Sequence, residues 1–233
     1  MATAILQARM SSSRLPGKVM LPIVGKPMIE LQIERVRRAV NISEVVVATS
    51  SDPTDDPLVE FLMRIGVRVV RGPLDDVLGR FLLAIETLGL TGDLVRLTAD
   101  CPLADPEVID ACITLQREGG FDYASNGRRR TYPRGLDVEV FRIEALQQAA
   151  RETRAQYDRE HVTPWLYRSG SPFSQGELVQ AKDESHLRWT VDFPADFAFV
   201  SRVYEALYPA NPAFTTDDIR ALPFGWREAD VEA

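Results

Sequence analysis

Four basic side chains stand near the start of the chain, before its first acidic residue. They are Arg9, Arg14, Lys18 and Lys26. The whole chain has a formal charge of −7, so these cations would create a local positive field in an acidic molecule. Gly17 lies among them, where the absence of a side chain allows backbone to approach a ligand closely. The segment is predicted to cradle a polyphosphate, although a solvated basic loop fits the charge pattern equally well.

Two aspartates follow apolar stretches far apart in the sequence. Asp100 comes just after Leu94–Leu97, and Asp192 comes just after a β-like stretch at 187–191. Ligand crevices of open α/β sheets lie at the carboxyl ends of strands, and Mg²⁺ favours one or two carboxylates with phosphate oxygens and water. Both aspartates are therefore candidate Mg²⁺ ligands. A turn or a helix cap would explain them structurally; for Asp192 this alternative is equally open.

The elements that would position these residues alternate between strands and helices. Strands are predicted near residues 4–8, 45–48, 67–70, 94–97, 121–124, 136–141, 177–182 and 187–191. Helices are predicted near residues 27–40, 55–65, 76–88, 106–115, 143–153, 159–168, 195–207 and 216–222, several of them beginning at Asp or Pro. This order predicts an α/β fold with a mainly parallel sheet covered on both faces.

Composition narrows the classes of function. The 233 residues are 45% apolar and 26% charged, which is enough for a substantial core, and the pI near 5.0 argues against nonspecific binding of nucleic acid or anionic lipid. No signal-peptide pattern or spanning segment is seen, so a cytoplasmic protein with no membrane partner is expected. Two cysteines and two histidines exclude a disulfide framework and a zinc cluster.

Five ordered segments resemble the acylneuraminate and spore-coat-polysaccharide type of cytidylyltransferases, relatives of the enzymes that make CMP-sialic acid and CMP-Kdo. The segments are LQARMSSSRLPGK at 6–18, TADCPL at 98–103, GLDVEVF at 135–141, EHVTP at 160–164 and TVD at 190–192. The resemblance implies a three-layer, Rossmann-like α/β/α fold of the nucleotide-diphospho-sugar transferase type. It also implies Mg²⁺-dependent transfer of CMP from CTP to a sugar or 2-keto sugar acid, with release of pyrophosphate, for surface polysaccharide or glycoconjugate biosynthesis.

The resemblance also implies roles for residues on the nucleotide side. Arg9, Arg14 and Lys18 fall where the family contacts the triphosphate, Arg80 is placed to reach the nucleotide, and the main chain at Gln7 and Ala8 is placed to read cytosine. Asp100 and Asp192 fall at the family's Mg²⁺ ligands. Arg14, Lys18 and Asp100 are the predicted catalytic residues, because cations and a metal ion stabilise charge that develops on the phosphates.

On the acceptor side, Asp137 and Glu139 are expected on one face of the strand 136–141, where the family contacts its sugar. An exposed strand face is the alternative. Arg134, which follows the arginines at 128–130, is the best candidate to pair with a sugar carboxylate, although most of that run suits solvated surface. His161 is either an acceptor-site contact or a histidine held by its neighbours at a helix end.

The chain is expected to form one nucleotidyltransferase domain over residues 1–233, with a nucleotide-binding half at 1–125 and a sugar-binding half at 126–233. As in relatives, a homodimer is expected, with its interface within 125–180. A glycosyltransferase of the same fold is the main alternative, but its usual Asp-x-Asp is absent. A nucleotide-binding subunit without activity is a further alternative. Thr98 stands where Kdo enzymes often have glutamine, which leaves the base and the sugar open.

Overall fold

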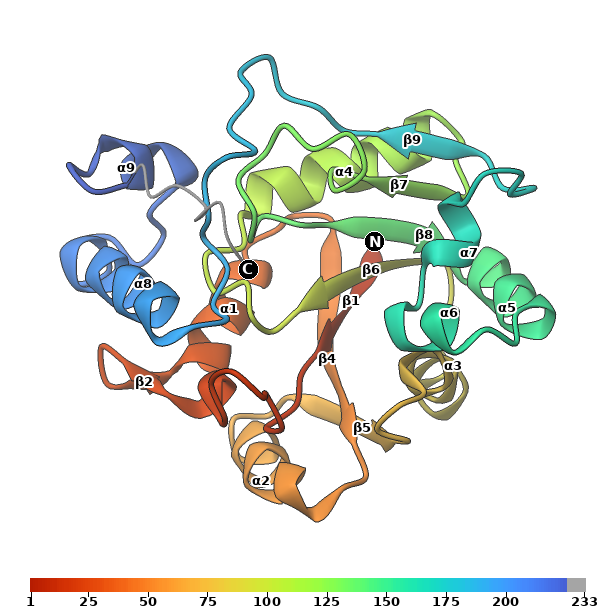
Figure 1. Ribbon diagram of the computed structural model, residues 1–233, viewed down its shortest axis with the longest axis horizontal. Coiled ribbons are helices and arrows are strands. Elements are labelled where there is room, and N and C mark those ends of the chain that lie inside the picture. Colours follow the sequence, from red (N-terminus) through yellow and green to blue (C-terminus); the bar gives the residue numbers. More distant parts are fainter. Residues whose placement is uncertain (226–233) are drawn as a thin grey trace.

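The computed structural model describes residues 1–225, which fold around one seven-stranded sheet (Figure 1). The strands are β1 (Ala2–Gln7), β4 (Ile42–Ser50), β5 (Arg68–Gly72), β6 (Asp93–Thr98), β7 (Tyr123–Ser125), β8 (Glu139–Arg142) and β9 (Gln175–Glu177). Their order across the sheet is β5-β4-β1-β6-β8-β7-β9. β5, β4, β1 and β6 are parallel, whereas β8 runs antiparallel to both of its neighbours. The predicted α/β class and mainly parallel sheet are confirmed.

Helices cover both faces of the sheet. Nine α-helices are described in residues 1–225: α1 (Met28–Val36), α2 (Asp56–Arg64), α3 (Val77–Leu88), α4 (Pro106–Glu118), α5 (Ile143–Glu152), α6 (Gln156–His161), α7 (Pro164–Tyr167), α8 (Pro194–Leu207) and α9 (Thr216–Ala221). Apolar residues of α1, α2 and α4 pack on one face, and those of α3 and α5 pack on the other. α8 and α9, blue in Figure 1, pack with a third cluster that includes the far side of α1.

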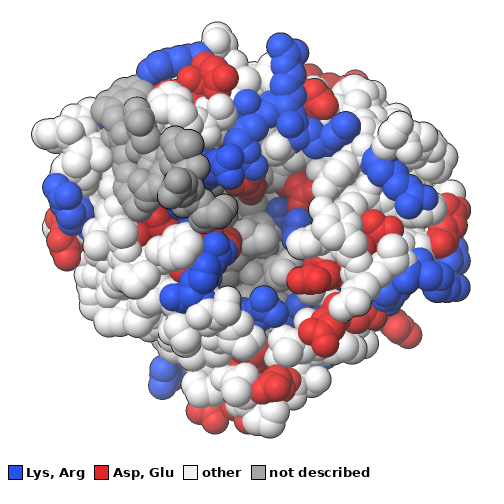
Figure 2. Space-filling view, in the orientation of Figure 1, with Lys and Arg blue, Asp and Glu red and all other residues white. Residues whose placement is uncertain are grey.

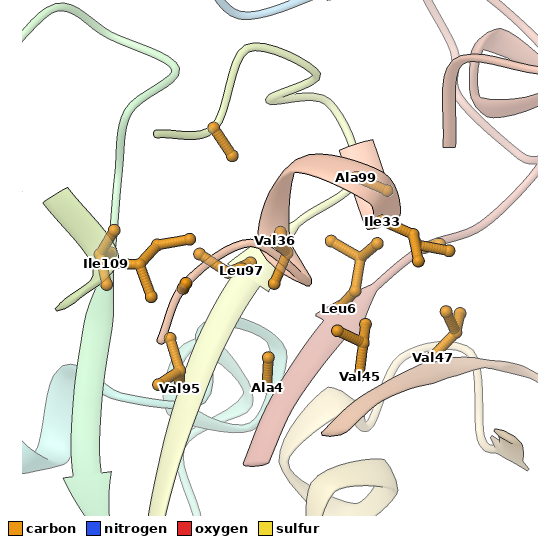
Figure 3. Packing of buried hydrophobic residues seen from close by; sticks show 14 of the residues in the cluster. Ala4, Leu6, Ile33, Val36, Val45, Val47, Val95, Leu97, Ala99 and Ile109 are labelled. Atoms are coloured by element: carbon orange, nitrogen blue, oxygen red, sulfur yellow. The ribbon is translucent and has the colours of Figure 1, made fainter. Parts of the chain in front are cut away.

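The two apolar clusters of the core follow from the alternation of side chains along each strand, which point to opposite faces of the sheet. In β1, Ala4 and Leu6 point to the face covered by α1, and Ile5 belongs to the opposite cluster. Figure 3 shows Ala4 and Leu6 among residues of β4 and β6, with Ile33 and Val36 of α1 above them. Both faces are apolar because both are buried, which explains the continuous apolar runs of the parallel strands.

Two predicted helix starts are confirmed by their caps. The carboxylate of Asp76 accepts a hydrogen bond from the amide of Gly79 and begins α3. Asp105 accepts from the amide of Glu107 at the start of α4, where Pro106 occupies the first turn. These caps fix where each helix leaves the edge of the sheet.

Other predictions need correction. The helix expected at 159–168 is two short helices, because Val162 adopts a φ of 72° between them. The segment 187–191 makes only an isolated bridge, between Arg134 and Arg188, and the strand expected at 136–141 begins at Glu139. A small hairpin, β2 (Pro22–Ile23) with β3 (Lys26–Pro27), was not predicted. Within residues 1–225, no helix has the length and apolar character needed to cross a membrane.

Candidate active site

The first loop, residues 8–17, leaves the carboxyl end of β1 and turns back on itself. The carbonyl of Met10 accepts hydrogen bonds from the amides of Ser12 and Gly17, both at 2.9 Å. Gly17 has a φ of 69°, a left-handed conformation that other residues rarely adopt, and it is followed by a 3-10 helix, η1 (Lys18–Met20). The glycine thus makes the turn that delivers Lys18 to the end of the sheet.

Asp55, at the start of the helix expected at 55–65, occupies the N-cap position of α2, but its carboxylate anchors the first loop and does not cap the helix. Its fully buried carboxylate accepts hydrogen bonds from the Met10 amide at 2.6 Å, the Thr49 hydroxyl at 2.9 Å and both the amide and hydroxyl of Ser50. No cap hydrogen bond from the helix reaches it. Asp55 therefore ties the loop after β1 to the end of β4.

Lys18 brings Asp100 and Asp192 together. Its side-chain Nζ lies 3.5 Å from Oδ2 of Asp100, 3.1 Å from Oδ1 of Asp192 and 2.6 Å from the carbonyl of Val191. The main chain holds the same geometry, because the Val191 amide donates to the Asp100 carbonyl at 2.7 Å. Two carboxylates 92 positions apart in sequence therefore share the contact shell of one cation.

The charges around Asp192 favour its ionised form. Burial raises the pKa of this carboxyl, but Lys18, Arg14 and Arg188 outweigh burial and lower the pKa below its usual value. Arg14 lies 3.1 Å from Oδ1 and stacks over the ring of Phe193, and Arg188 lies 2.9 Å from Oδ2. Asp192 is thus held as an anion in a cluster of cations.

Two cavities meet at these carboxylates, on the face that Figure 2 shows hollowed and rimmed by basic and acidic side chains. The smaller cavity, of about 410 Å³, is lined by the first loop, Lys18, Arg80 and His161. The larger, of about 940 Å³, is lined mainly by the segments 127–137 and 188–192. The residues that line both are Arg96, Thr98, Asp100 and Asp192. One crevice therefore has two compartments with an acidic junction.

A hydrogen-bonded network supports Arg96 at this junction. The guanidinium of Arg96 donates to Oε2 of Glu139 and, at 3.2 Å, to Oε1 of Gln7. The other carboxylate oxygen of Glu139 accepts from the hydroxyls of Tyr123, at 2.7 Å, and Thr163. Glu139 is thus held by β6, β7 and the break between α6 and α7, and it positions an arginine that reaches both cavities.

The larger cavity contains both paired and unpaired arginines. Arg130 pairs with Asp137, whose other oxygen accepts from the amide of Gly135 at 3.0 Å, and Arg128 lies 3.8 Å from Glu177. Arg129 and Arg134 also line this cavity, and neither guanidinium has an ion-pair partner in the described part of the chain. These two cations remain available to an anion in the larger cavity.

Arg80 is a buried cation of the smaller cavity whose guanidinium is only partly hydrogen-bonded. Its side chain is only 1% exposed, and its Nε and Nη1 have no hydrogen-bond partner among residues 1–225. Its Nη2 donates a long hydrogen bond, of 3.5 Å, to the carbonyl of Leu74. Burial and the nearby Arg9 lower its pKa below its ordinary value. A buried guanidinium without partners is costly unless a ligand supplies acceptors.

Residues 3–206 match the sequence profile of a family described as cytidylyltransferase. The chain belongs to the cytidylyltransferase family. It is therefore a nucleotidyltransferase, with a central sheet flanked by helices as in its structural relatives. The resemblance noted in the sequence is confirmed.

Similar proteins cover most of the chain. The spore coat polysaccharide biosynthesis protein SpsF of Bacillus subtilis is 32% identical over 221 residues, 86% of this chain and 85% of its own length. The 3-deoxy-manno-octulosonate cytidylyltransferase of Geobacter sulfurreducens is 38% identical over 186 residues, 78% of this chain and 68% of its own. A cytidylyltransferase from Leptospira borgpetersenii has the same fold, with a TM-score of 0.90 and 29% identity over 100% of this chain and 99% of its own.

In this cytidylyltransferase, the predicted site residues all line the two cavities, although their roles stay predictions. Those on the smaller cavity are Gln7, Ala8, Arg9, Arg14, Lys18, Arg80, Asp100, His161 and Asp192. Those on the larger are Asp100, Arg134, Asp137, Glu139 and Asp192. His161, predicted on the acceptor side, is exposed beside the first-loop cations and packs against Tyr157. Gln7 O accepts from the Ala99 amide and Ala8 N donates to Ala48 O, so these two main-chain groups are already engaged.

Three further site residues escaped the sequence analysis. Arg96 lies inside the apolar run of β6, and a single cation within such a run is the sequence feature that could have identified it as a site residue. Arg188 pairs with Asp192 and Asp196, and Asp55 anchors the first loop. Met10, which Asp55 anchors, lies 45 positions from it, and Glu139 lies 43 positions from Arg96, so local sequence patterns do not reveal either contact.

The carboxylate pair is suited to Mg²⁺. In residues 1–225 no group of three or more Asp, Glu, His or Cys side chains converges on a metal position, and the site has the two carboxylates of Asp100 and Asp192. Mg²⁺ characteristically binds through one or two carboxylates and completes its shell with phosphate oxygens and water. The carboxylates of Asp100 and Asp192 match this coordination preference, and both residues line each cavity.

Proposed function

We propose that the protein transfers CMP from CTP to a sugar or 2-keto sugar acid and releases pyrophosphate, with Mg²⁺ held by Asp100 and Asp192. The observation that carries this proposal is the acidic junction between a cavity lined by the first loop and an arginine-rich cavity. The triphosphate would lie along the first loop and the acceptor in the larger cavity. The α-phosphorus would then lie at the junction, within reach of both.

In the proposed reaction, an acceptor hydroxyl attacks the α-phosphorus of CTP and releases its proton to solvent, a new P–O bond forms and the bond to pyrophosphate breaks. Mg²⁺ would supply positive charge for the phosphate oxygens of CTP and the departing pyrophosphate. Arg9, Arg14 and Lys18 would orient the triphosphate and stabilise the charge that grows on it. The buried, unpartnered Arg80 would gain acceptors from the nucleotide.

The acceptor side favours an acidic sugar. Arg129 and Arg134 line the larger cavity without ion-pair partners within residues 1–225, and a carboxylate can pair with a guanidinium through two hydrogen bonds. The Geobacter relative is named for an acidic sugar, and the Bacillus relative for polysaccharide biosynthesis. A role in surface polysaccharide or glycoconjugate biosynthesis is part of the proposal.

The test is pyrophosphate release from CTP with Mg²⁺ and a panel of neutral sugars and 2-keto sugar acids. Release that depends on an acidic sugar is expected. Arg134→Gln should raise the KM for that sugar more than it lowers kcat, whereas Arg37→Gln, at an exposed site after α1, should change neither. Nucleoside diphosphate released from a nucleotide sugar, without pyrophosphate from CTP, would instead indicate glycosyl transfer.

A further inference from the structure

The position of Lys18 raises a question about how a metal ion enters the site. The Lys18 ammonium contacts both Asp100 and Asp192, and the residue is only 8% exposed. Its shortest contact is 2.6 Å, to the carbonyl of Val191. Two of the three acceptors, the carboxylates of Asp100 and Asp192, line both cavities, so Lys18 neutralises the junction and is not a free cation of the first loop.

An ion that used both carboxylates would have to take the place of this ammonium. Mg²⁺ binds its oxygen ligands at about 2.0–2.1 Å, whereas Nζ of Lys18 lies 3.1 Å from one carboxylate and 3.5 Å from the other. Two cations in that small space would repel each other strongly at low dielectric. The ammonium and the metal ion therefore exclude one another from the position between Asp100 and Asp192.

The Lys18 ammonium has a second position open to it, in the smaller cavity. It also lines the smaller cavity, together with Arg9 and Arg14 of the first loop. Its backbone is fixed by the turn at Gly17 and by η1, but its four-carbon side chain rotates freely enough to reach a new anion. A triphosphate in the smaller cavity would offer the ammonium new oxygen partners in place of the two carboxylates.

We propose that Lys18 is an internal counter-ion that occupies the metal position until nucleotide arrives, so that divalent ion and nucleotide bind cooperatively. Without nucleotide, an incoming ion must displace the ammonium from both carboxylates and from the Val191 carbonyl. With nucleotide, Lys18 transfers to the phosphates and the position is vacated. The coupling is reciprocal, so the ion strengthens nucleotide binding by the same factor. This inference rests on the proposed function, because it takes Asp100 and Asp192 as the metal ligands.

The test measures binding of Mn²⁺, a paramagnetic substitute for Mg²⁺, from the electron paramagnetic resonance signal of the free ion. Wild-type protein should bind Mn²⁺ weakly alone and about tenfold more tightly with CTP, after subtraction of Mn²⁺ bound by CTP without protein. Lys18→Met should bind Mn²⁺ alone about tenfold more tightly than wild type, because the ammonium no longer competes. The sequence groups Lys26 with the first-loop cations, but the structure places it outside the linings of both cavities, paired with Glu30 and Glu34. Lys26→Met should therefore behave as wild type.

Thermal unfolding gives a second readout. Lys18→Met leaves two neighbouring carboxylates without their shared cation, so Mn²⁺ alone should raise its melting temperature more than that of wild type. Lys18→Gln keeps an N–H donor for the Val191 carbonyl and replaces Lys18→Met if the latter does not fold. The neutral variants could bind Mn²⁺ alone no more tightly than wild type does, while wild type still binds Mn²⁺ in the presence of CTP. That result would overturn the counter-ion role of Lys18 and leave the proposed function standing. If wild type binds no Mn²⁺ even with CTP, the assignment of Asp100 and Asp192 as metal ligands in the proposed function is wrong.

Discussion

The amide of Val191 donates a hydrogen bond of 2.7 Å to the carbonyl of Asp100. The hydroxyl of Thr190 donates to the same carbonyl at 3.1 Å. The approach of Asp192 to Asp100 is therefore set by main-chain contacts between the segment after β6 and the segment before α8. The carboxylates are held at a fixed spacing before any ligand enters, which is the preorganisation that charge stabilisation requires.

Neutralising either carboxylate should remove metal-dependent turnover. Asp100→Asn and Asp192→Asn keep the size of the side chain but lose a negative charge that Mg²⁺ requires, so kcat should fall by about a hundredfold or more. Pyrophosphate release measured against Mg²⁺ concentration checks this, with circular dichroism to confirm the fold. Glu86→Gln, on the exposed surface of α3, is the matched control and should retain full activity. Full activity in both aspartate variants would end the metal assignment.

Arg80→Met should make the free protein more stable and the nucleotide complex weaker. The variant removes a buried charge whose Nε and Nη1 lack partners within residues 1–225, which should raise the free energy of unfolding by about 1 kcal/mol. For a chain of this size that is a rise of about 2–4 °C in melting temperature.

The same melting experiment with CTP separates this effect from nucleotide binding. CTP at a hundred times the wild-type Kd should stabilise wild type by about 2.7 kcal/mol and Arg80→Met much less. Arg37→Met, at an exposed arginine, should match wild type in both conditions. A less stable free Arg80→Met with an unchanged CTP shift would contradict a nucleotide role for Arg80.

Asp55→Asn should loosen the first loop. An amide cannot accept all the hydrogen bonds that the carboxylate of Asp55 receives, so one buried donor is left unsatisfied, at a cost of about 1–3 kcal/mol. The KM for CTP should rise as Met10 loses its anchor. Asp56→Asn is the neighbouring control, because the Asp56 side chain is half exposed and pairs with Arg71; urea unfolding should show a change within about 0.5 kcal/mol. Equal effects of the two variants would exclude the anchoring role.

Stability at low pH should depend on Asp192. Its pKa in the folded protein is lowered because Lys18, Arg14 and Arg188 outweigh burial, whereas an aspartate in an unfolded chain titrates near about 3.9. The stabilising contribution is therefore fully present above about pH 4 and is lost as the pH falls through the lower, folded value. Urea unfolding between about pH 6 and pH 2 should show a shallower decline for Asp192→Asn than for wild type. Glu86→Gln should keep the wild-type slope.

Local patterns predicted the parallel half of the sheet well. β1, β4 and β6 have buried apolar residues on both faces, so each appears in the sequence as a short apolar run, whereas the edge strand β5 is only partly buried. The capping aspartates Asp76 and Asp105 marked the helices that follow β5 and β6. The strands of the second half of the sheet were harder to predict from local patterns. β7 and β9 have three residues each, and the segment 187–191 is held by turns and a single bridge rather than by a ladder.

The residues of the candidate site were also only partly predictable from local sequence patterns. Cations of the first loop and the aspartates after apolar stretches could be found from residue type and position along the chain. Asp55 resembled a helix cap because it precedes a proline-led helix, and one of its hydrogen-bond donors, the Met10 amide, lies 45 positions earlier. Whether Glu139 faces solvent or the Arg96 guanidinium depends on the pairing of β6 with β8, which strand periodicity alone does not specify.

The reversed direction of β8 has a consequence for how acceptor preference can change. Because β8 runs opposite to β6 and β7, the connection at 126–138 begins and ends at the same edge of the sheet as the crevice. Asp137 and Arg134 lie on this connection, while the first loop belongs to a separate crossover from β1. Under the proposed function, exchanges at the exposed Arg128 and Arg129 would therefore alter the acceptor side at little cost to the fold. The main chain of Arg134 pairs with that of Leu187 and Trp189, ahead of Asp192, and Gly135 must be kept, since a Cβ there would lie 2.6 Å from the backbone of Trp189 and Thr190.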